Sequence, residues 1–158
     1  MNIIVRDHLN LDDKSRILRL WNQEYPERLT YNSFDDFDQY LNKLKNLNNY
    51  LLLDKQNKLK GWASTFDRDN EKWFAIIISS ELHGQGIGTK LLDLLKYDES
   101  NLNGWVIDHN LDKKLDGNTY RSPLEFYVKN DFEILKDIRL DIDIMSAVKI
   151  NWKKTYLK

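Results

Sequence analysis

The chain has 158 residues, and its 24 basic and 25 acidic side chains leave a formal net charge of -1. This near balance gives no electrostatic reason to expect a nucleic acid or an anionic membrane surface as a partner. The sequence contains no cysteine, which excludes a disulfide framework, a thiolate nucleophile and cysteine-ligated zinc.

The length suits a single domain over residues 1–158, with enough chain for a substantial core. No apolar run approaches the roughly 20 residues that a membrane-spanning helix needs. No signal peptide is recognisable, so we expect a cytoplasmic protein. The three histidines are scattered along the sequence, and we therefore expect no metal site.

The spacing of apolar residues predicts a strand and two helices at the start of the chain. Residues 2–6 are β-prone. Asp12 or Asp13 is the expected N-cap of a helix that runs to about Glu24. Ser33 is the expected N-cap of a second helix. The apolar positions of that helix recur at the helical period: Phe34, Phe37, Leu41, Leu44 and Leu47.

Three apolar runs then predict an antiparallel meander. The runs cover residues 50–53, 59–66 and 72–79, and short polar turns separate them. The stretch 74–78 is apolar without alternation, which predicts a central strand buried on both faces.

The next segment joins a glycine-rich turn to an amphipathic helix that ends near Tyr97. Glycine lets the backbone take a positive φ and approach a ligand closely. The N-terminus of a helix offers unpaired N–H groups that suit phosphate. We therefore predict a site for a pyrophosphate-bearing ligand in this segment, which holds three of the six glycines. Its residues are His83, Gly84, Gln85, Gly86, Ile87, Gly88, Thr89 and Lys90.

The last third of the chain predicts more strands and a short helix. Residues 104–108 are expected to form a strand, and residues 109–120 a polar loop. Ser122 is the expected N-cap of a helix over 123–129. A strand at 132–135 follows, and the even positions from 138 to 150 are mostly apolar, which is the period of a strand. The whole order indicates an α+β fold.

This order of elements and two motifs resemble the GNAT superfamily of acyltransferases. The glycine loop of that family follows the pattern Arg/Gln-x-x-Gly-x-Gly/Ala. Gly86 and Gly88 match the pattern, and His83 stands at its first position. The resemblance implies a central, mostly antiparallel mixed sheet of about seven strands with about four helices.

The second motif lies at residues 124–133 and resembles the family segment apolar-Tyr-x-Lys-x-Gly-Phe-Glu. In many members the tyrosine protonates the departing CoA thiolate, and Tyr127 stands at that position. Asp131 replaces the family glycine, and we expect Asn130 to take the left-handed turn conformation instead.

The resemblance implies acetyl-CoA as the acyl donor and direct transfer to an amine in a ternary complex. The acceptor would be a primary amine of a small molecule or a peptide. The pyrophosphate of CoA would bind backbone N–H groups of the glycine-rich turn. The pantetheine arm would pair with the backbone of the preceding strand at Ile76, Ile77 and Ile78.

An ammonium group must lose a proton before it attacks, so a general base or a water chain is needed. Family members often place a glutamate on the strand before the glycine loop, but residues 73–79 contain no carboxylate. His109 and Asp108 are the replacement candidates, because a histidine titrating near neutrality could take the proton. The neighbouring carboxylate could hold the histidine or bind a cationic substrate. A simple turn at these residues is the competing interpretation.

Three other functions are compatible with a glycine-rich turn of this kind. A nucleotide-binding oxidoreductase is disfavoured, because the glycine spacing and the preceding meander do not fit the dinucleotide fingerprint. A P-loop is disfavoured, because Thr89 and Lys90 stand in the wrong order. A CoA-binding regulatory or interaction module of the same fold, without catalysis, remains open, as does a homodimer.

Overall fold

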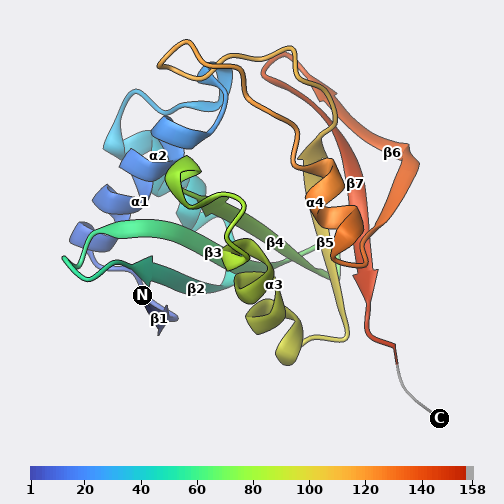
Figure 1. Ribbon diagram of the computed structural model, residues 1–158, viewed down its shortest axis with the longest axis horizontal. Coiled ribbons are helices and arrows are strands. Elements are labelled where there is room, and N and C mark those ends of the chain that lie inside the picture. The colour runs from blue at the N-terminus through green and yellow to red at the C-terminus, as the bar shows by residue number, and fades with distance from the viewer. Residues whose placement is uncertain (156–158) are drawn as a thin grey trace.

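Residues 1–155 are described by the computed structural model, and they form one seven-stranded sheet with four α-helices (Figure 1). The strand order is β1-β2-β3-β4-β5-β7-β6, and every neighbouring pair is antiparallel except β4 and β5. The predicted meander is therefore confirmed. The elements are β1 (Asn2–Arg6), α1 (Leu11–Glu24), α2 (Phe34–Asn42), β2 (Lys45–Leu53), β3 (Leu59–Arg68), β4 (Glu71–Ile78), α3 (Ile87–Tyr97), β5 (Asn101–Ile107), α4 (Leu124–Lys129), β6 (Glu133–Ile142) and β7 (Met145–Lys153).

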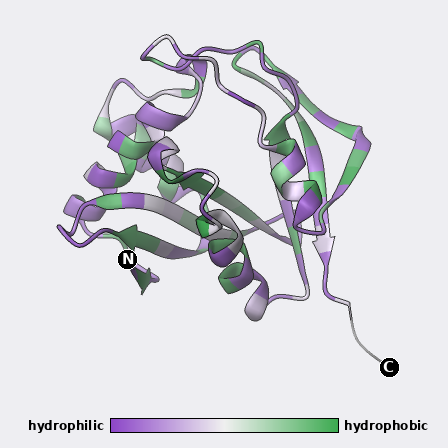
Figure 2. Ribbon diagram, in the orientation of Figure 1, coloured by the Kyte–Doolittle hydropathy of each residue, from purple (hydrophilic) through white to green (hydrophobic). Residues whose placement is uncertain are grey.

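Each face of the sheet has its own hydrophobic core, because side chains alternate along a strand. On β3, Ala63 belongs to the core shared with α3 and α4, whereas its neighbour Trp62 belongs to the core shared with α1 and α2. Phe74 and Ile77 of β4 divide between the two cores in the same way. Figure 2 shows the hydrophobic colouring concentrated along the central strands, with hydrophilic residues on the outward turns of the helices.

The sheet is interrupted between β4 and β5. These parallel strands pair at one position only, Trp73 with Asn103, and they diverge beyond it (Figure 1). Asn103 reinforces the junction, since its Nδ2 donates to the carbonyl of Lys72 at 3.1 Å. On the next residue, Gly104, a Cβ would lie 2.8 Å from Cε1 of Phe74. Glycine at that position therefore lets the Phe74 ring occupy the base of the opening.

The N-cap of the first helix differs from the predicted one. The cap is Asn10, whose Oδ1 accepts the N–H of Asp13 at 2.7 Å, while Asp13 Oδ2 accepts the N–H of Asn10 at 3.3 Å. The expectation of Asp12 or Asp13 as the cap is wrong. Asp13 is instead the third helical residue of a capping box, the position that an acidic residue takes when it returns a bond to the cap.

The second helix starts at the predicted cap, Ser33, but ends at Asn42. Leu44, in the bend after the helix, and Leu47, in β2, continue the helical spacing in the sequence, and both pack onto the core shared with α1 and α2. A tightly bent connection thus places two apolar residues where a longer helix would also have placed them, and the periodicity cannot distinguish the two arrangements.

Two local predictions near α4 also need correction. Asp131, not Asn130, takes the left-handed conformation, with φ of 72° against -101°. A short polar side chain tolerates that conformation, so aspartate serves at the position itself. Pro123 is the residue that precedes the helix, and the expected cap, Ser122, instead accepts the N–H of Leu124 with its hydroxyl at 3.2 Å.

Candidate functional site

A cavity of about 1180 Å³ occupies the opening between β4 and β5. Because the ladder is missing there, the cavity passes from one face of the sheet to the other. We call the part on the α3 and α4 side the first chamber. Its walls are Ile76, Ile78, the glycine-rich turn, Phe126 and Tyr127. We call the part on the α1 and α2 side the second chamber. Its walls include Trp21, Tyr40, Phe66, Arg68, Trp73 and Trp105.

The edge of β4 presents free backbone groups to the first chamber. The N–H of Ser79 donates to the carbonyl of Lys60 at 2.8 Å, so alternate residues of β4 point their backbone toward β3. By this alternation Ile77 faces β3, whereas Ile76 and Ile78 face the opening. The strand predicted to be buried on both faces is therefore half open, because Ala75, Ile76 and Ile78 remain partly exposed along the cavity.

The glycine-rich turn has the conformation of an anion-binding turn. Gly84 and Gly86 both have φ of +78°, and Gly86 precedes α3 without any side-chain cap. The first three N–H groups of α3, at Ile87, Gly88 and Thr89, have no protein partner within the described residues. Unpaired N–H groups together with the positive end of the helix dipole form a site that attracts phosphate oxygens.

The third glycine of the turn brings two helices together. A Cβ on Gly88 would lie 2.8 Å from Cζ of Phe126, so only glycine allows the start of α3 to approach α4 this closely. The remaining members of the predicted segment lie differently. The backbone N–H of Lys90 donates to the carbonyl of Gly86 at 3.2 Å, and the side chain of Gln85 turns back to the carbonyl of Glu81.

His83 connects the turn to the end of β4. Its Nε2 lies 3.0 Å from the carbonyl oxygen of Ile78, one of the backbone groups that faces the opening. The imidazole therefore stiffens the turn, and it leaves the N–H of Ile78 and the backbone of Ile76 as the free groups on this edge.

Tyr127 projects from α4 into the base of the first chamber. Its ring is packed edge-on against Phe74, Phe126 and Phe132, and 7% of the residue is exposed. Burial, reinforced by the nearby phenol of Tyr120, raises the pKa of Tyr127 above its ordinary value. The hydroxyl, which has no hydrogen-bond partner within the described residues, is therefore a protonated donor at neutral pH that is available to a ligand.

Glu24 is a buried carboxylate that reasoning from the sequence did not single out. It is 6% exposed at the end of α1, and it lines the cavity. Its Oε1 pairs with Lys114 Nζ at 3.3 Å, and its Oε2 accepts the N–H of Ser80 at 3.1 Å. It thereby ties α1 to the turn after β4 and to the loop before α4. A signal was present, since position 24 continues the buried helical spacing of Ile17, Leu20 and Trp21.

The loop over residues 108–123 contributes Lys114 and residues 118–123 to the lining of the cavity. It reaches the connection between α1 and α2 (Figure 1), where the N–H of Glu27 donates to the carbonyl of Lys113 at 2.8 Å. Arg28 joins three segments there. Its Nη2 lies 2.8 Å from Asp112 Oδ1, and its Nη1 donates to the carbonyl of Asp143 in the β6–β7 turn at 2.9 Å.

The two residues predicted to remove the acceptor proton lie outside the walls of the cavity. Asp108 forms a two-pronged ion pair with Arg139, at 2.9 and 3.1 Å, and this bonding lowers the pKa of Asp108. His109 accepts the N–H of Leu111 with Nδ1 at 3.1 Å. The role of both residues in proton removal stays a prediction.

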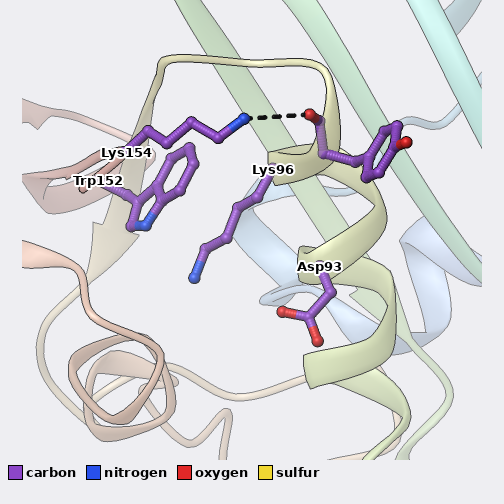
Figure 3. Close-up of a pocket in the computed structure, with 5 residues that line it drawn as sticks. Asp93, Lys96, Trp152 and Lys154 are labelled. Atoms are coloured by element: carbon purple, nitrogen blue, oxygen red, sulfur yellow. Dashed lines mark hydrogen bonds between the residues drawn. The ribbon is translucent and has the colours of Figure 1, made fainter. Parts of the chain in front are cut away.

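A second hollow lies at the opposite end of α3 and contains no comparable chemistry. Figure 3 shows Lys96 and Trp152 side by side between α3 and β7. The ammonium of Lys96 lies 5.1 Å from the Trp152 ring centre and donates to the carbonyl of Asn130 at 2.6 Å. Lys154 donates to the carbonyl of Tyr97 at 3.4 Å. The contacts of Lys96 and Lys154 therefore anchor the end of α3 beside β7.

The family model "Acetyltransferase (GNAT) family" matches residues 14–105, more than half of the chain. The chain belongs to the GNAT acetyltransferase family, as the sequence motifs predicted. The matched residues include the glycine-rich turn and end before Tyr127. No significant match was found among curated protein sequences.

Solved structures confirm the GNAT fold across nearly the whole chain. An aminoglycoside 6'-N-acetyltransferase complexed with coenzyme A matches with a TM-score of 0.71, 17% identity and 97% of each chain covered. A phosphinothricin acetyltransferase from Sinorhizobium meliloti in complex with AcCoA matches with a TM-score of 0.63, 16% identity, and 97% and 89% covered. A mutant spermidine N-acetyltransferase SpeG from Vibrio cholerae matches with a TM-score of 0.64, 17% identity, and 97% and 95% covered.

Two of these solved structures contain a ligand of this class, coenzyme A in the first and acetyl-CoA in the second. Their identities to this chain are low enough that the likeness concerns the fold alone. Among the described residues, none of the helices has the length and the apolar character that crossing a membrane requires.

The Glu24–Lys114 pair should make a measurable contribution to stability. We expect Lys114→Met to lower the free energy of unfolding by about 3 kcal/mol, because it leaves a buried carboxylate without its counter-charge. Urea titration followed by circular dichroism measures the change. Lys113→Met, at an exposed neighbouring position, is the matched control and should change stability by less than about 0.5 kcal/mol. Equal effects of the two substitutions would contradict this account.

Proposed function

We propose that the protein transfers the acetyl group of acetyl-CoA directly to a primary amine of a small molecule or a peptide. One observation carries the proposal. The cavity crosses the sheet at the β4–β5 opening and joins an anion-binding turn on one face to a separate chamber on the other. Two substrates can therefore approach one point from opposite sides, which direct transfer in a ternary complex requires.

The first chamber suits acetyl-CoA. Backbone N–H groups between Gly84 and Thr89 hold the pyrophosphate, and the positive end of α3 faces its charge. The pantetheine arm pairs with the open edge of β4 at Ile76 and Ile78. Lys90 contributes at most the ammonium group of its side chain, since its N–H is used within the helix.

The transfer forms an N–C bond to the acetyl carbon and breaks the C–S bond of the thioester. Negative charge develops on the sulfur as the bond breaks, and the phenol of Tyr127 donates a hydrogen bond and a proton to it. The nitrogen loses its proton either to His109, as the sequence suggests, or to water in the open cavity. The position of His109 outside the cavity wall favours water.

Binding of acetyl-CoA can be tested with two glycines that share one conformation. Gly86 and Gly117 have φ of +78° and +85°, and a Cβ would meet nothing within 4 Å at either position. Alanine at each should cost about 1–2 kcal/mol of stability through the same backbone strain. Only Gly86→Ala should weaken acetyl-CoA, by tenfold or more on calorimetric titration, because it distorts the phosphate-binding turn. An unchanged dissociation constant for Gly86→Ala would remove the turn from the binding site.

The second test concerns the proton donor. Tyr127→Phe should reduce kcat by about 10²–10⁴-fold, the usual effect of losing a general acid, and should leave the dissociation constant of acetyl-CoA nearly unchanged. Release of free CoA thiol with an amine panel measures kcat. Tyr120→Phe removes another, partly buried phenol at the cavity wall and should lower kcat far less. Binding of acetyl-CoA without transfer to any amine would instead support the non-catalytic module.

The pH profile distinguishes the two routes for the amine proton. If water takes the proton, kcat/KM rises with pH up to the pKa of the acceptor amine, and His109→Ala leaves the profile unchanged. If His109 takes it, His109→Ala lowers kcat/KM and changes the shape of the pH profile. Because burial raises the pKa of Tyr127, no loss of rate should appear at or below pH of about 10. We expect the first outcome.

A further inference from the structure

We propose that the acceptor is an amine with an anionic group, a carboxylate, at the far end of an apolar or aromatic body, and that Arg68 and Trp73 in the second chamber bind this carboxylate. The inference rests on the proposed acetyl transfer and names the substrate class for it. It follows from the hydrogen-bond donors, the charges and the walls of the second chamber.

Arg68 is a cation of the second chamber that has no ion-pair partner in the described part of the chain. Its guanidinium carbon lies 5.0 Å from the ring centre of Phe66 and 5.2 Å from that of Trp73, so stacking fixes it at the cavity wall. No carboxylate within the described residues forms an ion pair with it. The adjacent Asp67 is already bonded to Lys72. A stacked, planar guanidinium with free N–H groups is well suited to a carboxylate.

The indole N–H of Trp73 is a second hydrogen-bond donor in the second chamber. Trp73 is 3% exposed, it lines the cavity, and its Nε1–H is buried without a hydrogen-bond partner in the described part of the chain. Buried donors normally have a partner, so an unpaired one at a cavity wall points to an acceptor supplied from outside. Because the guanidinium carbon of Arg68 lies 5.2 Å from the centre of the Trp73 ring, the two donor-bearing side chains are neighbours, and we expect one carboxylate to reach both.

The charges around the second chamber also favour an anion. The ammonium of Lys149 lies 5.2 Å from the Trp73 ring but is paired with Glu71 at 2.9 Å. Lys114 is paired with Glu24 in the same manner. Glu71 is also the cross-strand partner of Arg68, so Arg68, Lys149 and Glu71 together carry a net positive charge beside Trp73, and within the described residues Arg68 forms no ion pair of its own. An acceptor with a second ammonium group would meet that charge, whereas a carboxylate would neutralise it.

The aromatic walls of the second chamber indicate what kind of spacer joins the amine of the acceptor to its carboxylate. Trp73 and Trp105 stand with ring centres 5.3 Å apart, and Phe66 and Tyr40 add further aromatic surface. The thioester is expected beside Ile76, three residues along β4 from Trp73. At about 3.3 Å per residue this places the anion roughly 7–10 Å from the reacting nitrogen. That separation fits an ω-amino carboxylate with a flat or extended apolar spacer.

The test uses three acceptors that differ only at the far end: 4-(aminomethyl)benzoate, 4-(aminomethyl)benzamide and 1,4-bis(aminomethyl)benzene. With the unmodified protein, kcat/KM should be about tenfold to a hundredfold higher for the carboxylate than for the amide, the usual effect of a charge-assisted hydrogen bond. The diamine should be the poorest of the three. The difference should appear in KM with little change in kcat.

Arg68→Gln should abolish the preference for the carboxylate by raising its KM to that of the amide or above, and Arg68→Lys should restore part of the preference. Arg19→Gln, an exposed arginine on α1, is the matched control and should change nothing. Equal kcat/KM values for the three acceptors, a best rate with the diamine, or a uniform loss in Arg68→Gln would each overturn the inference.

A binding measurement separates this inference from the proposed function. 4-Methylbenzoate cannot be acetylated, and it should quench the fluorescence of the chamber tryptophans more strongly than 4-methylbenzamide at equal concentration. Arg68→Gln should remove that difference. If no amine is acetylated but the benzoate still binds through Arg68, the transferase proposal fails and the anion site stands. If amines are acetylated but the benzoate and the benzamide bind equally well, the transferase proposal stands and the anion site fails.

Discussion

One pair, Trp73 with Asn103, joins the two halves of the sheet. Every feature of the site depends on the shortness of this contact. A longer ladder would fill the opening with backbone hydrogen bonds and use the edge of β4 that faces β5. Because pairing stops after one position, the edge of Ile76 and Ile78 stays free, and the cavity reaches both faces of the sheet. Asn103 and Gly104 stabilise the point at which the β4–β5 pairing ends. Asn103 donates a hydrogen bond to the carbonyl of Lys72, and Gly104 leaves room for the Phe74 ring.

The parts of the fold that the sequence predicts are those set by local chemistry. Alternating and helical periods locate the strands and helices, and the three glycines locate the turn, because positive φ at Gly84 and Gly86 is a local requirement. The boundaries were less predictable. Leu44 and Leu47 keep helical spacing although the helix has already ended at Asn42, and Asn10 caps a helix whose first acidic residues look equally suitable.

The second chamber could not be predicted in the same way, because residues far apart in sequence form it. Phe66 and Arg68 come from the end of β3, Trp105 comes from β5, and Tyr40 comes from α2. The residues next to Arg68 in the sequence do not indicate that its guanidinium forms no ion pair in the described structure, because the ion pairs depend on where each carboxylate lies after folding. Glu24 was more accessible, because a glutamate in the buried spacing of a helix needs partners. The assignment of His109 rested on its position after β5 in sequence, and only the folded loop shows its ring turned to Leu111.

The two chambers are made by different segments of the chain. β4, the glycine-rich turn and α4 enclose the first, whereas α1, α2, the end of β3 and the β6–β7 turn contribute walls to the second. They share β4 and β5, the two strands that border the opening. Substitutions that reshape the second chamber can therefore accumulate without disturbing the phosphate-binding turn. In a diverging lineage with this architecture, the choice of amine should change readily while the donor stays the same, and the aromatic and charged residues beside Arg68 are where such divergence would be recorded.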